Sequence, residues 1–382
     1  MPHRGGLASR CGGGAVTGRT DSHRGAVEFA VVGAGWRTGF FLRIAAAIPR
    51  MNICGIVARN DARRAGIEAE WRVPCFATID ELLDSTRPDY VVASVSPPAI
   101  PDVCVRLARR GIPILAETPP STTLDGLVEL YETLTSLDAR IQIAEQFWAQ
   151  PLHASRQAVV DSGVLGPINQ VHLSVCHDYH AMSLIRRLLG AGYAEATIRG
   201  TRYSAPVLAG PDRTGPPAGE HLVEAQTDYA WLDFGGGLGV YEFCLPQYRS
   251  WIRGQRVCIR GERGEIIDDT VTWLRDARTP ITARLVRHEA GRNGNHEGHH
   301  LKAIQFLDSW IWENPVGPAR LNDEEIAVAQ CLLAMHRYVE TGESFYSLAE
   351  ASQDQYLALG CREAIRRGEI VRTGAQVWQP SA

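Results

Sequence analysis

The stretch VEFAVVGAGWRTGFFLRIAAAIP, residues 27–49, decides the fold of the N-terminal half of the chain. It opens with a short apolar run that ends in glycines. Residues with helical spacing follow until Pro49 stops the helix. This order predicts a strand, a tight glycine turn and a helix, which together form the first unit of a parallel α/β sheet.

The same alternation of strand and helix continues as far as Phe147. The expected strands are residues 52–58, 88–96, 112–117 and 139–146, and the expected helices begin at Asp61 or span 80–85, 101–111 and 124–137. Strands that alternate with helices pair in parallel, because each crossover returns the chain to the same end of the sheet. We therefore expect a doubly wound α/β (Rossmann) domain over residues 26–148.

The pattern changes after about Pro151, where one helix is followed by strand after strand. The expected strands are residues 168–175, 197–204, 224–234, 238–245, 256–261, 264–268 and 281–288. Consecutive strands joined by glycine-rich turns indicate a large, mainly antiparallel sheet and therefore a separate α+β domain over residues 149–382. Residues 205–221 are expected to form a long surface loop, and the segment from His299 to Glu369 is expected to be helical.

Composition limits the possible functions. A chain of 382 residues with 45% hydrophobic residues is long enough for two domains, and its formal net charge of -4 provides no basic field for nucleic acid. The nine cysteines include no C-x-x-C pair and are typical of reduced thiols in the cytoplasm. Residues 1–25 lack an apolar core of the signal-peptide kind and are expected to be a disordered extension, and no run is apolar enough for a membrane span.

The glycine turn matches two of the three glycines in the dinucleotide-binding pattern G-x-G-x-x-G. Gly33 permits the tight turn, and Gly35 allows a pyrophosphate to approach the start of the helix. Thr38 stands where the third glycine serves close helix–strand packing. Trp36 and Arg37 lie between these positions. These five residues are the predicted core of a cofactor site.

Four further positions follow strands that end at the same edge. After the second strand, where a carboxylate usually binds the ribose diol, the chain has Arg59. A guanidinium suits a 2′-phosphate, so NADP(H) is favoured over NAD(H), the alternative being that Arg59 is a solvated surface charge. Ser94, Ser96 and Pro97 follow the fourth strand, where ligands bind in open α/β sheets.

The stretch CHDYHAMSLIRRLLG, residues 176–190, places His177, Asp178, Tyr179 and His180 next to one another before an apolar helix. Imidazole titrates closest to neutral pH, so His180 is the predicted proton-transferring group, with Tyr179 or His177 as a second donor. If the segment is a strand, His177 and Tyr179 share one face and Asp178 and His180 share the other. Structural polar residues and a metal site remain the alternatives.

In the order in which they occur, these motifs resemble those of the glucose-fructose oxidoreductase and inositol dehydrogenase family, known as Gfo/Idh/MocA. The matching segments are residues 33–49, 89–98, 109–121, 170–190 and 260–269. The resemblance implies a Rossmann domain, an open antiparallel sheet that is often buried in homodimers or homotetramers, and oxidation or reduction of sugars, cyclitols and similar small molecules with a nicotinamide cofactor. It also implies that Gln146 lies near the nicotinamide.

Two departures from the family pattern concern the mechanism. The family has Glu-Lys-Pro where this chain has Glu117-Thr118-Pro119, and a threonine hydroxyl carries no charge to stabilise an alkoxide. In the second motif His180 matches the catalytic histidine, but Cys176 and Ser183 replace both of its aspartate neighbours. Asp178 and His177 are the expected substitutes.

The sequence therefore predicts a cytoplasmic NAD(P)-dependent oxidoreductase that moves hydride to or from a C–O or C–N carbon of a small polar metabolite. Glu117 and Thr118 would flank the nicotinamide. The missing lysine leaves two alternatives open: an imine reductase or net non-redox oxidation–elimination enzyme, and a cofactor-binding protein without catalysis. The sequence His296–His300 contains H-E-x-x-H, but Gly298 interrupts it, and a loop before a helix is expected there instead of a zinc site.

Overall fold

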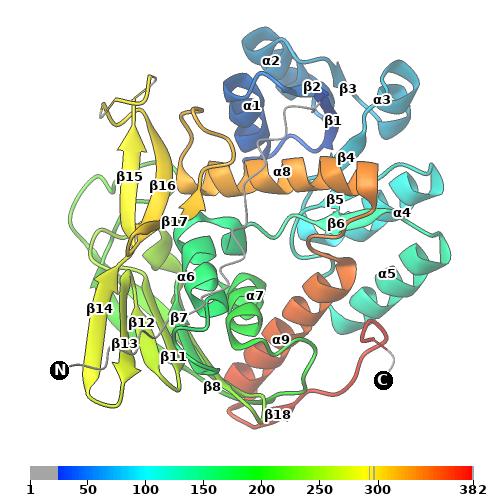
Figure 1. Ribbon diagram of the computed structural model, residues 1–382. Helices are drawn as coiled ribbons and strands as arrows, with labels where there is room; N and C mark the ends of the chain where they lie inside the picture. The colour runs from blue at the N-terminus through cyan, green and yellow to red at the C-terminus, as the bar shows by residue number, and fades with distance from the viewer. Residues whose placement is uncertain (1–24, 292, 296, 381–382) are drawn as a thin grey trace.

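The computed structural model describes residues 25–291, 293–295 and 297–380 (Figure 1). The predicted N-terminal extension thus lies almost wholly outside the described residues, as does His296. In the described part of the chain, no helix is long and apolar enough to cross a membrane.

A six-stranded parallel sheet forms the N-terminal domain, in the order β3-β2-β1-β4-β5-β6. Its elements are β1 (Val27–Val32), α1 (Thr38–Ala47), β2 (Met51–Val57), α2 (Asp61–Trp71), β3 (Cys75–Phe76), α3 (Ile79–Ser85), β4 (Tyr90–Ala93), α4 (Ile100–Arg109), β5 (Ile114–Ala116), α5 (Leu124–Ser136) and β6 (Ile141–Ile143). The strand order reverses between β1 and β4, which is the place where doubly wound sheets bind ligands. The predicted Rossmann architecture is confirmed.

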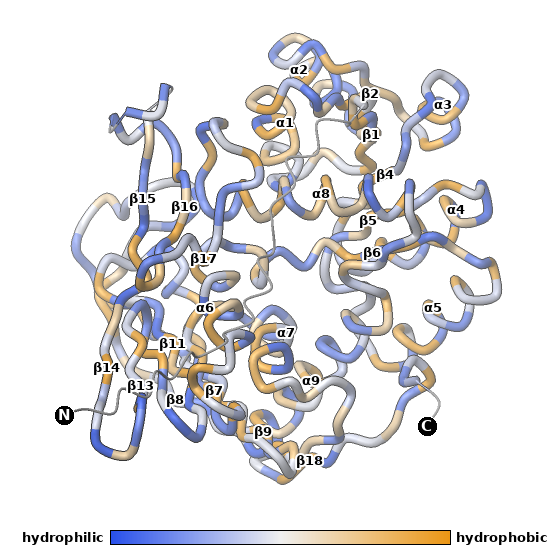
Figure 2. Tube along the Cα trace, viewed as in Figure 1, coloured by the Kyte–Doolittle hydropathy of each residue, from blue (hydrophilic) through white to orange (hydrophobic). Residues whose placement is uncertain are grey.

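A nine-stranded, mainly antiparallel sheet follows, in the order β14-β13-β12-β11-β7-β10-β9-β8-β18, and only β7 and β10 pair in parallel within it. Its strands are β7 (Ile168–Ser174), β8 (Thr197–Leu208), β9 (Leu222–Asp233), β10 (Leu238–Cys244), β11 (Arg256–Gly261), β12 (Gly264–Ile267), β13 (Thr270–Asp276), β14 (Thr279–Arg284) and β18 (Val371–Arg372). The helices α6 (Pro151–Asp161), α7 (Asp178–Leu189) and α9 (Leu348–Arg367) lie against one face of this sheet (Figure 1). The turn between β13 and β14 is hydrophilic (Figure 2).

The predicted helix from His299 onward is wrong at its start. The chain forms β16 (His300–Phe306) and β17 (Ser309–Glu313), which pair with β15 (Val286–Ala290) in a small third sheet. Strand β16 buries Leu301 and Ala303 in alternation, but the register shifts after Ile304. Both Ala303 and Ile304 are buried, so the alternation is broken, and the apolar residues Leu301 and Ile304 have the spacing of a helix.

Two other boundaries differ from the prediction. Residues 281–288 belong to two strands in different sheets, β14 and β15, with buried Leu285 between them. The expected loop 205–221 is shorter, because β8 continues to Leu208 and pairs with β9 as far as Leu222.

Helix α8 (Asp323–Thr341) joins the two halves of the molecule. It begins with a capping box at Asn322 and runs between the two domains (Figure 1). Its buried residues Ile326, Leu332 and Met335 pack in one hydrophobic cluster with β1, β2 and α1. A C-terminal segment therefore completes the core of the N-terminal sheet.

Buried Tyr346 connects β6, α7 and α9. Its backbone carbonyl accepts from Ile143 N at 2.9 Å, which attaches it to the edge of β6. Its hydroxyl donates to Ser183 Oγ of α7 at 2.7 Å and also contacts the carboxylate of Asp354 of α9, which in turn accepts from Arg186 Nη1 at 2.5 Å. The side chain is 1% exposed, so this network lies inside the protein.

We predict that Tyr346→Phe lowers the free energy of unfolding by about 1–3 kcal/mol, because the buried Ser183 and Asp354 each lose a partner. Urea denaturation measures this change. Tyr203→Phe is the control, since Tyr203 is 65% exposed and its loss is expected to change stability by less than about 0.5 kcal/mol. Equal stability of the two variants would contradict the importance of the network.

Candidate active site

The glycine turn after β1 lies directly against the end of β4. Gly33 has φ +125°, and a Cβ atom there would lie 1.9 Å from the carbonyl oxygen of Ser94, so only glycine fits. Thr38 is fully buried, and its hydroxyl donates to Gly33 O at 3.1 Å. Thr38 therefore fixes the start of α1 to the turn in the place of the third glycine of the pattern.

The turn has the features that a dinucleotide requires. No heavy atom outside its chain neighbours lies within 4 Å of a Cβ built on Gly35, so the backbone there is open to a ligand. The first turn of α1 contains no acidic residue and its N-terminus has no side-chain cap, which leaves its positive end available to a phosphate. Trp36 is 48% exposed beside this opening.

The other predicted cofactor residues lie at the same edge of the sheet. Ser94 is buried after β4, and Ser96 and Pro97 are exposed beyond it. Arg59 is exposed after β2. Arg63, at the start of α2, donates from Nε to Ala34 O at 3.1 Å and so crosses the glycine turn.

Helix α7 begins at Asp178, and His177 is its N-cap residue. The predicted pairing of faces, His177 with Tyr179 and Asp178 with His180, is therefore wrong, because it needs a strand. Asp178 has φ +46°, a strained conformation for an aspartate, which is fixed by Tyr241 and Arg362. The Tyr241 hydroxyl accepts from Asp178 N at 3.2 Å, and Arg362 donates to both carboxylate oxygens.

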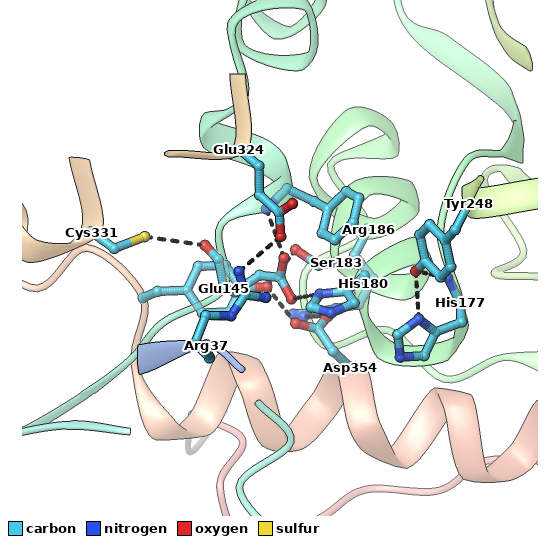
Figure 3. Close-up of polar contacts among 12 residues, drawn as sticks. Arg37, Glu145, His177, His180, Ser183, Arg186, Tyr248, Glu324, Cys331 and Asp354 are labelled. Atoms are coloured by element: carbon cyan, nitrogen blue, oxygen red, sulfur yellow. Dashed lines mark hydrogen bonds and ion pairs between the residues drawn. The ribbon is translucent and has the colours of Figure 1, made fainter. Parts of the chain in front are cut away.

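Glu145 is the carboxylate that contacts His180. Its Oε2 lies 2.6 Å from His180 Nδ1, and both side chains are almost fully buried, at 2% and 6% exposure (Figure 3). Glu145 follows β6 in the N-terminal domain, and His180 lies in the first turn of α7 in the second. Asp178 is paired with Arg362 instead, so the expectation that it replaces the missing aspartates is wrong.

Burial sets the protonation of this pair. Desolvation raises the pKa of Glu145 to about 8, against the hydrogen bond from Phe147 N and nearby cations, which lower it. Desolvation also lowers the pKa of His180 below its usual range, and the charge of Arg37 lowers it further. At neutral pH the proton between the two groups therefore resides on the carboxyl, and the imidazole is neutral.

The rings of His177 and Tyr179 lie beside His180, and Tyr248 lies beside His177. His177 Nδ1 lies 2.5 Å from the hydroxyl of Tyr248, and desolvation lowers the pKa of His177 to about 4. Tyr179 lies 4.4 Å from His180 between ring centroids, and its hydroxyl is hydrogen-bonded to Thr118. Burial raises the pKa of Tyr179, so its phenol stays protonated and remains a donor. The structure thus brings together the four predicted catalytic residues.

Arg37 extends from the glycine turn towards this centre (Figure 3). Its Nη1 lies 2.8 Å from Glu324 of α8, and its Nε lies 3.5 Å from Glu117 after β5. Gln146, with its amide oriented to donate to Ala144 O, accepts from Arg37 Nη2 at 3.2 Å. Predicted cofactor residues from three strand ends therefore meet at one guanidinium.

Sequence reasoning missed Glu145, Tyr248 and Glu324. A signal for Glu145 exists in the sequence, because it directly follows an apolar strand in the same way as Glu117 and precedes Gln146, which the resemblance singled out. Tyr248 and Glu324 lie far along the chain, and no motif marks them. Among the described residues, no group of three or more His, Cys, Asp or Glu is arranged to hold a metal ion.

Comparisons with solved structures agree with this architecture. The chain is 13% identical to levoglucosan dehydrogenase in complex with NADH and levoglucosan, with a TM-score of 0.65 over 91% of this chain and 99% of that one. An NAD binding oxidoreductase from Klebsiella pneumoniae is 12% identical, with a TM-score of 0.65 over 92% and 100%. The WlbA dehydrogenase from Bordetella pertussis, in complex with NADH and UDP-GlcNAcA, is 14% identical, with a TM-score of 0.61 over 92% and 100%.

At these low identities, the TM-scores and the coverage establish a common fold and nothing more. No curated protein matches the chain in sequence. Residues 27–145 match the family described as an oxidoreductase family with an NAD-binding Rossmann fold. Together with the glycine turn and the strand order, this match assigns the N-terminal domain, residues 27–145, to the Gfo/Idh/MocA oxidoreductase family with its NAD-binding Rossmann fold.

Proposed function

We propose that the protein catalyses reversible hydride transfer between a nicotinamide cofactor and a ring carbon of a cyclic polyol or sugar-like metabolite. The observation that carries this proposal is the buried Glu145–His180 pair, which lies where the ends of β5 and β6 meet the start of α7. A buried titratable pair close to a dinucleotide turn is typical of proton transfer coupled to redox chemistry.

The glycine turn and the first turn of α1 would bind the cofactor diphosphate, and Glu117 and Gln146 would lie beside the nicotinamide. When bound, the nicotinamide accepts or supplies the hydride. The protein contributes the position of the reacting groups and the transfer of one proton.

His180 and Glu145 provide the route for that proton. In the oxidation direction the hydroxyl proton of the substrate passes to His180 Nε2, and the Nδ1 proton passes to the ionised carboxylate of Glu145. The alcohol becomes a ketone when its carbon also gives up a hydride, which a bound nicotinamide would accept. In the reduction direction protonated Glu145 returns its proton to Nδ1, and the Nε2–H group donates to the carbonyl oxygen. Tyr179, a protonated donor beside Thr118, supplies a second hydrogen bond.

The rings around His180 support the substrate class. His177, Tyr179, Phe147 and Tyr248 present aromatic and imidazole surfaces, with Phe147 at 4.5 Å from His180 between ring centroids. Rings of this kind pack on the apolar faces of sugars, while their polar tips bind hydroxyl groups. The neighbours with the same fold include one in complex with levoglucosan and one in complex with a nucleotide sugar.

We also propose that the protein forms a homodimer or homotetramer through the helix-free face of the nine-stranded sheet. Tyr203 of β8 and Trp231 of β9 are 65% and 42% exposed there. Apolar side chains gathered on an open sheet face are typical of an interface between protein subunits.

The protonation of Glu145 is testable through stability. The folded state holds its proton up to about pH 8, whereas an unfolded glutamate releases it at about pH 4.3. This contribution to the free energy of unfolding is complete below about pH 4 and disappears as the pH rises through 8. We therefore predict that Glu145→Gln loses less stability than the wild type between pH 5 and pH 9 in urea denaturation. The exposed control Glu132→Gln should follow the wild type; a wild-type slope in Glu145→Gln would contradict the assignment.

The pH dependence of the reaction rate should also report the ionisation of Glu145. The oxidation rate is expected to rise with pH to a plateau above about 8, because it needs ionised Glu145, and the reduction rate should fall over the same range. His180→Ala and Glu145→Gln should lower kcat by about 10²–10⁴-fold while Kd for NADH, measured by fluorescence, changes little. His172→Ala, on the outer face of β7, is the control. Cofactor binding without turnover on any polyol, sugar or imine would favour the non-catalytic alternative.

We also propose that the protein prefers NADP(H) to NAD(H). This proposal depends on Arg59, which follows β2, and on Arg63 of α2, which contacts the glycine turn at Ala34. If Arg59 binds a 2′-phosphate, Arg59→Ala should raise Kd for NADPH about tenfold or more and leave Kd for NADH within twofold, since a charge-assisted hydrogen bond contributes about 1.5–3 kcal/mol. Fluorescence titration with both cofactors measures this. Tighter binding of NADH by the wild type would assign the protein to NAD(H).

A further inference from the structure

The reaction centre contains a cation that does not come from the position where the family has its lysine. Thr118 carries no charge, yet Arg37 reaches the same region from the β1–α1 turn and contacts Glu117, the residue just before Thr118. Its side chain is only 19% exposed. Its charge also acts on the protonation of Glu145, His180 and Tyr179, so it is close to all three.

We propose that Arg37 is the cationic residue of the reaction centre and stabilises the negative charge that develops on the substrate oxygen. This inference rests on the proposed function. A fixed positive charge in a water-poor site is worth more than in solution, because little solvent competes for it. The guanidinium is always protonated, so it provides charge and donors and leaves the proton transfer to His180 and Glu145.

The geometry of the guanidinium suits this role. A guanidinium has five N–H donors, and the contacts to Glu324, Glu117 and Gln146 use one on each of its three nitrogens. Two N–H groups are therefore available to a ligand. The three contacts come from α8 and from the segments that follow β5 and β6, so the group is held by three parts of the chain before any substrate binds.

The other arginines near the site are held elsewhere. Arg362 donates to both carboxylate oxygens of Asp178, the first residue of α7. Arg187 lies over the ring of Trp148, at 4.6 Å from the ring centroid, and within 3.8 Å of Glu350. Of these three arginines, Arg37 alone joins the cofactor turn to the strand ends at which Glu117 and Glu145 lie.

The groups that face Glu145 fix the expected pH effect. They are His180 and Arg187 of α7, His177 before it, Arg37 of the turn, Glu117 after β5 and Cys331 of α8, whose thiol donates to the Glu145 carbonyl oxygen at 3.7 Å. Arg37 favours the ionised carboxylate and opposes a charged imidazole. Its removal should therefore move both titrations to higher pH.

The test compares Arg37→Met and Arg37→Lys with Arg43→Met. Arg43 is the matched control, because it also pairs with a glutamate of α8, at 2.6 Å from Glu325, and also lies over Phe40, but it is six residues further along α1. One readout is kcat against pH with the cofactor. A second readout needs no cofactor: the ¹⁵N imidazole shifts of His180, assigned with His180→Gln, report the tautomer change that follows ionisation of Glu145.

We expect Arg37→Met to lower kcat by about 10²–10³-fold and to move the His180 transition to higher pH. Arg37→Lys should recover at least tenfold of that loss, and Arg43→Met should stay within threefold of the wild type. Three results would overturn the proposal. They are a kcat of Arg37→Met within threefold of the wild type, a His180 transition at the same pH as in the wild type, and a loss of kcat in Arg43→Met equal to that in Arg37→Met. If the wild type shows no turnover, the proposed function is wrong. If Arg37→Met nevertheless moves the His180 transition to higher pH, the position of the Arg37 charge beside Glu145 and His180 is supported.

Discussion

Tyr346 provides the constraint on which the candidate site depends. Its backbone is bound to β6 at Ile143, two residues before Glu145, and its hydroxyl is bound to Ser183, one helical turn after His180. The distance between the carboxylate and the imidazole is therefore fixed by a side chain that takes no part in the chemistry. A site assembled from two domains needs such a connection, because small displacements at reacting atoms reduce catalysis steeply.

The Glu145–His180 pair shows why burial is useful here. An exposed glutamate is ionised at neutral pH and returns a proton poorly, whereas desolvation moves its pKa to about 8. The pair can then hold or release one proton within the physiological range. Burial of a pair with no net charge also avoids the penalty of an isolated buried ion, which would cost several kcal/mol.

Local patterns in the sequence were sufficient to predict the N-terminal domain. The glycine turn, the strand–helix alternation and the position of His180 depend on neighbours within a few residues, and these features agree with the structure. The start of α7 was ambiguous because His177 and Asp178 suit both a strand end and a helix cap. The β16 strand was misread because a bulge after Ile304 interrupts its alternation. Glu145 was overlooked as the partner of His180 because the two are joined only by tertiary packing.

The charges at the centre come from segments that are far apart in sequence. Glu117 and Glu145 follow neighbouring strands, Arg37 lies in the first turn of the domain, and Glu324 comes from α8, 287 residues later. Only the packing of α8 against β1, β2 and α1 places Glu324 beside Arg37. Threonine at position 118 removes a charge locally, while the distant elements supply one from another direction. The electrostatics of the site are therefore a property of the tertiary fold, which explains why a motif that lacks its lysine is a poor guide to whether the chemistry is retained.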